Sequence, residues 1–213
     1  EIVYFVGEWP VARLCPKDAV FHDHYDAWDA KRAEALKDAD IPPVSSAFVE
    51  SMYETESFIL TMMNKHYDAS PVDERKHIYY TMLAYWKYVL EAYKPELILF
   101  NLVPHSLYTN IVHDLARREN IPMFSFEESW IAARLLIYSD FWKGSGEIRS
   151  ALQSALKKGV TEDDLHPDVR EYFEWFTNKG ADKTPWYIKE QKSFASGLGI
   201  WMHRARIALR APG

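Results

Sequence analysis

The sequence predicts an α/β fold in which a mainly parallel, Rossmann-like sheet of about four to six strands carries helices on both faces. Three observations predict it. Short apolar segments of strand length recur along the chain, longer segments with helical periodicity separate them, and polar residues directly follow several of the strands. Apolar strands that alternate with helices are typical of a parallel sheet buried between helices.

The N-terminal part contains two short expected strands. Residues 2–6 are apolar and end at Gly7, and residues 19–21 form a second apolar run. A segment rich in Ala, Lys, Glu and Asp follows at 27–39. We expect this segment to be a helix, because the chain is broken only afterwards, at Pro42 and Pro43.

Two long helices are expected next. Ser45 or Ser46 can cap the first, in which apolar residues recur at helical spacing as far as Met63. The second runs from about Val72 to Tyr93, and the Lys94-Pro95 pair ends it.

The middle of the chain reads as a strand–helix–strand unit. Residues 96–101 and 121–126 are the strands, and residues 107–119 carry helical periodicity between them. The short connections predict parallel neighbouring strands with a right-handed crossover. Residues 134–138 fit one more short strand.

The remainder of the chain is expected to be helical, at about 147–158 and 167–178. We therefore divide the chain into a Rossmann-like domain at 1–145 and a helical C-terminal extension at 146–213. The first residues lie inside an expected strand and no Met precedes them, so we expect the chain to be a fragment whose extension leads to a second domain.

Composition narrows the classes of function. The formal net charge of −6 argues against nucleic-acid binding, which needs a basic face. Cys15 is the one cysteine, so no internal disulfide can form and a reducing, cytoplasmic location is expected. No apolar run is long enough to cross a bilayer. Aromatic residues make up 15% of the chain, which suits a core but also a sugar-binding cleft.

Polar clusters follow the expected strands, where ligands of parallel α/β sheets bind. We expect substrate contacts from residues at or near these strand ends, namely Glu8, His22, His24, Asn101 and Asp140, the last with Lys143 beside it. His22 and His24 would share one face of an extended segment and could bind a metal ion, but no third ligand is evident. We therefore assign no metal site.

Three residues are candidates for catalysis. His105 follows a strand end and could act as a general base or, when protonated, hold a phosphate. Its alternative role is to satisfy a loop carbonyl. Glu127 and Glu128 follow a strand directly, and burial of one of them would raise its pKa into the acid/base range. The alternative is that one supports a helix start and the other is solvated.

The sequence lacks the motifs of several common enzyme classes. The sequence contains no G-x-x-x-x-G-K-[ST] phosphate loop, no G-x-G-x-x-G after the first strand, no G-x-S-x-G elbow and no H-E-x-x-H. These absences weigh against nucleoside-triphosphate hydrolases, Rossmann dehydrogenases, serine hydrolases and zinc proteases.

One stretch resembles a known family. The residues Asn101-Leu102-Val103-Pro104-His105, Tyr108, Ala116 to Pro122 and Phe126-Glu127-Glu128 are similar to the N-terminal half of capsular and other surface-polysaccharide glycosyltransferases of the GT-B kind. The resemblance covers residues 98–140. It implies the acceptor-side domain of a sugar-transferring enzyme, with His105, Glu127 or Glu128 as the base that deprotonates an acceptor hydroxyl.

The same resemblance implies the partners. A glycan acceptor would bind here, whereas the nucleotide-sugar donor would bind a domain that this sequence does not contain, so no cofactor is assigned to this chain. Two alternatives remain open. One is a non-catalytic binding or scaffold module of a polysaccharide-biosynthesis assembly, and the other is a small-molecule hydrolase on a flavodoxin-like fold that uses His22 and His24.

The C-terminal tail at 183–210 reverses the charge of the chain. It carries six Lys and Arg residues against Glu190, interleaved with aromatic and aliphatic residues. Such a segment can lie on an anionic membrane, which predicts peripheral contact with the cytoplasmic face of the inner membrane. The alternative is a helix that packs on a neighbouring domain.

Overall fold

A computed structural model describes residues 1–65, 67–129, 131, 134–185, 188–189 and 192. The chain groups into two compact units: the first contains Glu1–Ser129 and the stretch that ends at Lys157, and the second contains Ile131 and the described residues from Lys158 onward. The expected domain boundary at 145 lies inside the first unit. Most of the basic tail, including 193–213, lies outside the described residues.

The first two strands form a parallel pair. β1 (Tyr4–Gly7) runs beside β2 (Val20–Asp23), with Tyr4 opposite Val20 and Gly7 opposite Asp23. A 3-10 helix at Trp9–Leu14 connects them, and α1 (His24–Trp28) follows β2 without a break. Because the strands are parallel and in register, both end at the same edge, as the sequence predicts.

The prediction of a helix at 27–39 is wrong. The chain instead forms the five-residue α1, a loop, and a short 3-10 helix at Glu34–Leu36. Ala30 has a left-handed backbone with φ of 59°, which stops an α-helix at that point. The loop also brings the Lys31 carbonyl to His22 and the Ala33 N–H to Tyr85, so tertiary hydrogen bonds override the local helix propensity.

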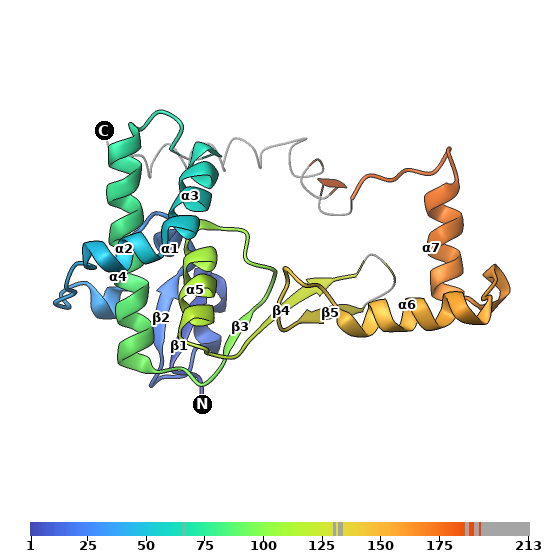
Figure 1. Cartoon of the computed structure of the whole chain (residues 1–213), viewed down its shortest axis with the longest axis horizontal. Coiled ribbons are helices and arrows are strands. Elements are labelled where there is room, and N and C mark those ends of the chain that lie inside the picture. Colours follow the sequence, from blue (N-terminus) through green and yellow to red (C-terminus); the bar gives the residue numbers. More distant parts are fainter. Residues whose placement is uncertain (66, 130, 132–133, 186–187, 190–191, 193–213) are drawn as a thin grey trace. The chain divides into compact units, whose positions relative to one another are not determined.

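The two long helices expected between 45 and 93 are α2, α3 and α4 in Figure 1. The first expected long helix is divided into α2 (Ser46–Ser51) and α3 (Tyr53–Met62), which meet at Met52. Ser45 caps α2 by accepting the Phe48 N–H at 3.2 Å. The second expected helix is confirmed as α4 (Val72–Tyr93), which ends at Lys94 in a left-handed conformation.

The strand–helix–strand unit is confirmed. β3 (Ile98–Phe100) and β4 (Met123–Glu128) are parallel neighbours, and α5 (Leu107–Arg118) connects them. Ser106 and Thr109 form a reciprocal capping box at the start of α5. The strand expected at 134–138 is present as β5 (Leu135–Tyr138), but it is antiparallel to β4.

The hydrophobic core lies among α3, α4 and α5. Its largest fully buried apolar side chains come from all three helices and from the turn after α3: Ile59, Met63, Tyr79, Met82, Leu83, Ile111 and Leu115. Partly buried residues of β1, β3 and β4, among them Tyr4, Ile98 and Met123, pack against this cluster. The helices therefore cover the side of both sheets on which these residues lie.

Helices on both faces of a single sheet are not what the chain forms. The architecture is mixed α/β with a two-stranded parallel sheet and a three-stranded mixed sheet. One face of the three-stranded sheet exposes Leu99, Phe124, Leu135 and Ile137. In the described part of the chain, a helix covers only the opposite face, that of Phe100.

The C-terminal helices are close to their expected positions. α6 (Gly146–Lys158) follows β5, and α7 (Pro167–Thr177) follows a 3-10 helix at Glu162–Asp164. Neither α6 nor α7 contains a buried residue. Within the described residues, no helix is both long enough and apolar enough to cross a membrane.

Candidate functional site

The end of β2 holds the buried polar residues His22 and Asp23. Asp23 caps α1, because its Oδ1 accepts the N–H groups of Tyr25 at 3.0 Å and Asp26 at 3.3 Å. Its second carboxylate oxygen, Oδ2, is buried and has no hydrogen-bond partner among the described residues. Asp23 therefore stabilises the start of α1 with one carboxylate oxygen, while the other oxygen accepts no hydrogen bond from the described residues.

His24 links this strand end to the next one. Its Nδ1 lies 2.9 Å from the hydroxyl of Tyr108, which belongs to the first turn of α5. Burial raises the pKa of Tyr108 to about 12, so the phenol keeps its proton at neutral pH. The polar clusters after β2 and β3, which are more than 80 residues apart in sequence, therefore meet at one edge of the fold.

Asn101 and His105 lie in the connection between β3 and α5. Both side chains are exposed, and His105 is one residue before the N-cap of α5. The Nδ1–H of His105 donates to the Val103 carbonyl at 2.9 Å, so the neutral ring carries its lone pair on Nε2. A neutral imidazole with an exposed basic nitrogen is suited to accept a proton from a hydroxyl group.

Two exposed aromatic rings lie near β1 and β2, one of them beside His24. Tyr25 is 57% exposed, and its ring meets that of His24 edge-on at 5.3 Å. Trp9, two residues after the end of β1, is 69% exposed, and its ring centre lies 5.3 Å from that of Phe21 on the face of the β1–β2 pair that carries Phe5. Exposed rings beside polar groups are suited to stack on the apolar face of a sugar. Glu8 precedes Trp9 and is exposed.

Glu127 and Glu128 lie on opposite faces of β4. β4 continues beyond the end of β3, and successive side chains of a strand point to opposite faces. Glu127 accepts a hydrogen bond from the Tyr138 hydroxyl at 3.0 Å, while Glu128 is exposed on the other face. Of the two, Glu127 shares the face of the buried Ser125.

Asp140 has a local structural role. Its carboxylate accepts the N–H groups of Trp142 and Lys143 and forms an ion pair with the Lys143 ammonium at 3.0 Å. Burial alone would raise the pKa of Asp140, but these contacts with Lys143 and Trp142 outweigh it and hold the pKa below its usual value. Asp140 thus stabilises the turn after β5.

His22 has no ring atom left for a substrate. The side chain is 1% exposed, its Nδ1 lies 2.8 Å from the Tyr4 hydroxyl, and its Nε2 lies 3.1 Å from the Lys31 carbonyl. Burial lowers the pKa of His22 to about 4, although the Lys31 carbonyl and nearby carboxylates oppose the shift. We correct its assignment from substrate binding to support of the β1–β2 pair.

The contacts of His22 form a directed chain of hydrogen bonds. A carbonyl can only accept, so Nε2–H donates to Lys31 and Nδ1 accepts from Tyr4. The Tyr4 oxygen then accepts from the Tyr85 hydroxyl at 2.7 Å, and the Tyr85 oxygen accepts the Ala33 N–H at 3.0 Å. The His22 tautomer with its proton on Nε2 therefore allows every donor and acceptor in this chain to form its hydrogen bond.

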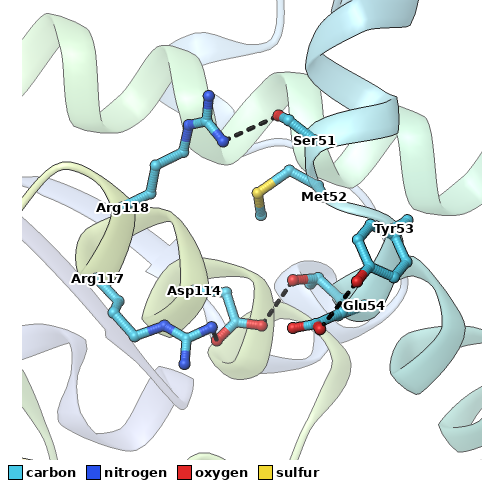
Figure 2. Close-up of a pocket in the computed structure, with 8 residues that line it drawn as sticks. Ser51, Met52, Tyr53, Glu54, Asp114, Arg117 and Arg118 are labelled. Atoms are coloured by element: carbon cyan, nitrogen blue, oxygen red, sulfur yellow. Dashed lines mark hydrogen bonds and ion pairs between the residues drawn. The ribbon is translucent and has the colours of Figure 1, made fainter.

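A shallow pocket of about 290 Å³ lies at the other end of α5. Figure 2 shows Arg117 and Arg118 from α5 facing the junction of α2 and α3. Arg118 donates to the Ser51 Oγ at 2.9 Å and lies 5.0 Å from the centre of the Phe48 ring. Ten residues of helix separate Tyr108 from Arg118, about 15 Å along the axis, so the pocket is distinct from the strand-end site.

Asp114 anchors that pocket. Its Oδ2 accepts from Thr55 at 2.7 Å, and its Oδ1 accepts from the buried His113 at 2.9 Å. Burial alone would raise the pKa of Asp114, but the hydrogen bonds from His113 and Thr55, with Arg117 nearby, lower it. With Glu54, the lining offers two guanidinium groups and two carboxylates, which suits a ligand that both donates and accepts.

The sequence did not reveal these partners. Tyr4 and Tyr85 are 81 residues apart, and Thr55 and Asp114 are 59 apart, so no local pattern could join them. Tyr108 is different, because it is one of the residues that carry the family resemblance. Within the part of the chain that the structure describes, no group of three or more His, Cys, Asp or Glu residues is placed to hold a metal ion.

No protein-family model, curated protein or solved structure matches the chain.

Proposed function

We propose that this chain is the acceptor-side part of a glycosyltransferase that adds a sugar from a nucleotide-sugar donor to a surface polysaccharide or glycan. The observation that carries the proposal is the hydrogen bond between His24 and Tyr108, which gathers the ends of β2 and β3 at one edge. His105 is exposed, its Nδ1 is engaged by the Val103 carbonyl, and it directly precedes the N-cap of α5, so its Nε2 supplies the base.

The exposed rings support an acceptor of this class. Tyr25 offers an exposed flat surface beside the His24 imidazole, and the exposed Trp9 lies against the Phe21 ring. A sugar presents an apolar ring face surrounded by hydroxyls, so it requires both kinds of contact. The hydrolase alternative has less support, because both ring nitrogens of His22 are already engaged.

The general-base role of His105 gives the decisive test. Loss of a general base lowers a rate by roughly 10²- to 10⁴-fold. In the complete gene product, His105→Ala is expected to reduce nucleotide release from a nucleotide-sugar by this factor while acceptor binding changes little. His77→Ala is the matched control, because His77 is an exposed histidine on α4.

Glu127→Gln and Glu128→Gln separate the remaining candidates. Glu127 accepts from Tyr138, so we expect its substitution to have a larger effect than that of the exposed Glu128. A panel of nucleotide-sugars that yields no release, together with retained glycan binding, would replace the proposal with the non-catalytic binding module. If the protein neither releases nucleotide nor binds a glycan, both proposals are refuted.

A further inference from the structure

Five large apolar residues gather on one face of the three-stranded sheet. The register places Leu99 beside Phe124, and Phe126 beside Ile137, with Leu135 two residues before Ile137 on the same face. Four of them, all except the half-buried Phe126, are between 39% and 63% exposed. We call this surface the sheet face. Soluble proteins rarely leave such a continuous apolar surface in water.

A second apolar surface lies on α6. Ile148, Leu152 and Leu156 recur every four residues, so they form one stripe along the helix. They are between 50% and 71% exposed. We call them the helix stripe. A sheet face and the apolar stripe of a helix are the two surfaces that pack together in α/β proteins, so the chain carries both halves of one contact.

Ring contacts fix the connection between β5 and α6. Phe141 packs against His113 of α5 with 4.8 Å between ring centres, and Trp142 lies 6.2 Å from Phe58 of α3. These contacts hold the connection on the side of the sheet that α5 covers. The chain therefore enters α6 from the side of the sheet opposite the sheet face.

We propose that two copies of this chain associate, with the helix stripe of each copy packed on the sheet face of the other. A two-fold axis satisfies both surfaces of both copies at once, because each contributes one helix and one sheet. If each of the eight side chains buries roughly 100 Å², each copy contributes about 800 Å², the share of a standard stable interface.

Charge at the margins favours the same arrangement. Glu128 is exposed on the sheet face, opposite Leu135 in the β4–β5 register. Lys157 follows Leu156 at the end of the helix stripe. In the reciprocal dimer, a carboxylate on one copy and an ammonium on the other lie at the rim, where opposite charges help to fix the orientation.

The mass of the full chain in solution tests the proposal. Analytical ultracentrifugation over a micromolar concentration series is expected to show a species of twice the 24.9 kDa chain mass. Leu152→Glu is expected to give the single-chain mass, because it places a carboxylate in the middle of the interface. Ser150→Glu, on the opposite side of α6, is the matched control and should remain dimeric. A monomer throughout the series would overturn the proposal.

A charge-swap experiment tests which surfaces face each other. Ile137→Lys on the sheet face is also expected to give monomers, and Leu14→Lys, at another exposed apolar site, controls for the added charge. The double variant Ile137→Lys/Leu152→Glu should recover the dimer, since the introduced charges are opposite across the interface. All variants should keep the wild-type circular dichroism spectrum. A dimer that both single variants leave intact, or a double variant that stays monomeric, would refute this arrangement.

Discussion

Tyr4, Tyr85 and His22 show how single side chains support the strand-end site. His22 accepts from Tyr4 and donates to the Lys31 carbonyl, so only its neutral form fits the directed hydrogen bonds. The ring also stacks on Trp86 with 5.5 Å between ring centres. Since β2 continues directly from His22 to Asp23 and α1, this network sets the direction in which His24 leaves the strand.

Protonation of His22 should destabilise the protein. Its pKa is about 4 in the folded chain and about 6.5 when unfolded, so the unfolded state binds more protons between these values and stability falls as pH falls. We expect His22 to account for a loss of about 2 kcal/mol between pH 7.5 and pH 5.

Urea unfolding of the wild type and His22→Gln at both pH values measures this contribution. The variant has no imidazole to titrate. Between pH 7.5 and pH 5, its free energy of unfolding should therefore fall by about 2 kcal/mol less than that of the wild type. Equal changes in the two proteins would show that His22 does not have the lowered pKa.

The hydroxyl of Tyr85 should contribute strongly to stability. Tyr85→Phe removes the donor to Tyr4 and leaves the Ala33 N–H buried without its acceptor. A buried unsatisfied group costs about 1–3 kcal/mol, and we expect a loss of this size in the free energy of unfolding. Tyr25→Phe is the control, because Tyr25 is exposed and should change stability by less than about 0.5 kcal/mol. Equal effects would contradict the network.

At the scale of elements, periodicity predicted α4 and α5 well, but it missed the break between α2 and α3 and the loop within 27–39. α4 and α5 carry their own apolar faces, and Pro95 marks the end of α4, so their bounds follow from the sequence. The segment 27–39 has good helix formers but takes its shape from hydrogen bonds to His22 and Tyr85. Those partners lie outside any local window, so propensity alone predicted the wrong element.

The contact between α3 and α5 should depend on one hydroxyl. Thr55→Val keeps the volume of the side chain but removes the donor to Asp114, whose carboxylate is largely buried. We expect a loss of about 1–3 kcal/mol in the free energy of unfolding. Thr61→Val is the matched control on the same helix, since Thr61 is exposed and bonds only to the Ser57 carbonyl.

Acid titration provides a second measurement of the same contact. The pKa of Asp114 is lowered in the folded chain, so its stabilisation is present above the unfolded pKa and lost as pH falls through the folded value. Removal of the Thr55 donor should raise that pKa. The difference in stability between wild type and Thr55→Val should therefore shrink towards low pH, and a constant difference would show that the hydroxyl does not act on the carboxylate.

At the scale of the whole chain, the sequence indicated where polar residues would gather but not which would remain accessible. His22 and His24 are two residues apart, yet one is enclosed by Tyr4 and Trp86 and the other contacts Tyr108 at the edge. Burial depends on the packing of distant helices. The same reasoning applies to the sheet face, because an apolar strand has the same pattern whether one side or both sides are covered.

The charge distribution along the chain gives the last prediction. The six basic residues of 183–210 contrast with a net charge of −6, so the rest of the chain is strongly acidic and this tail is the segment we expect an anionic membrane to attract. We expect the full chain to co-sediment with phosphatidylserine vesicles at low salt and to dissociate at high salt. Removal of 183–213, or Arg204→Glu with Arg206→Glu, should abolish co-sedimentation. Neutral phosphatidylcholine vesicles are the control, and unchanged association of the truncated chain would exclude membrane contact through the tail.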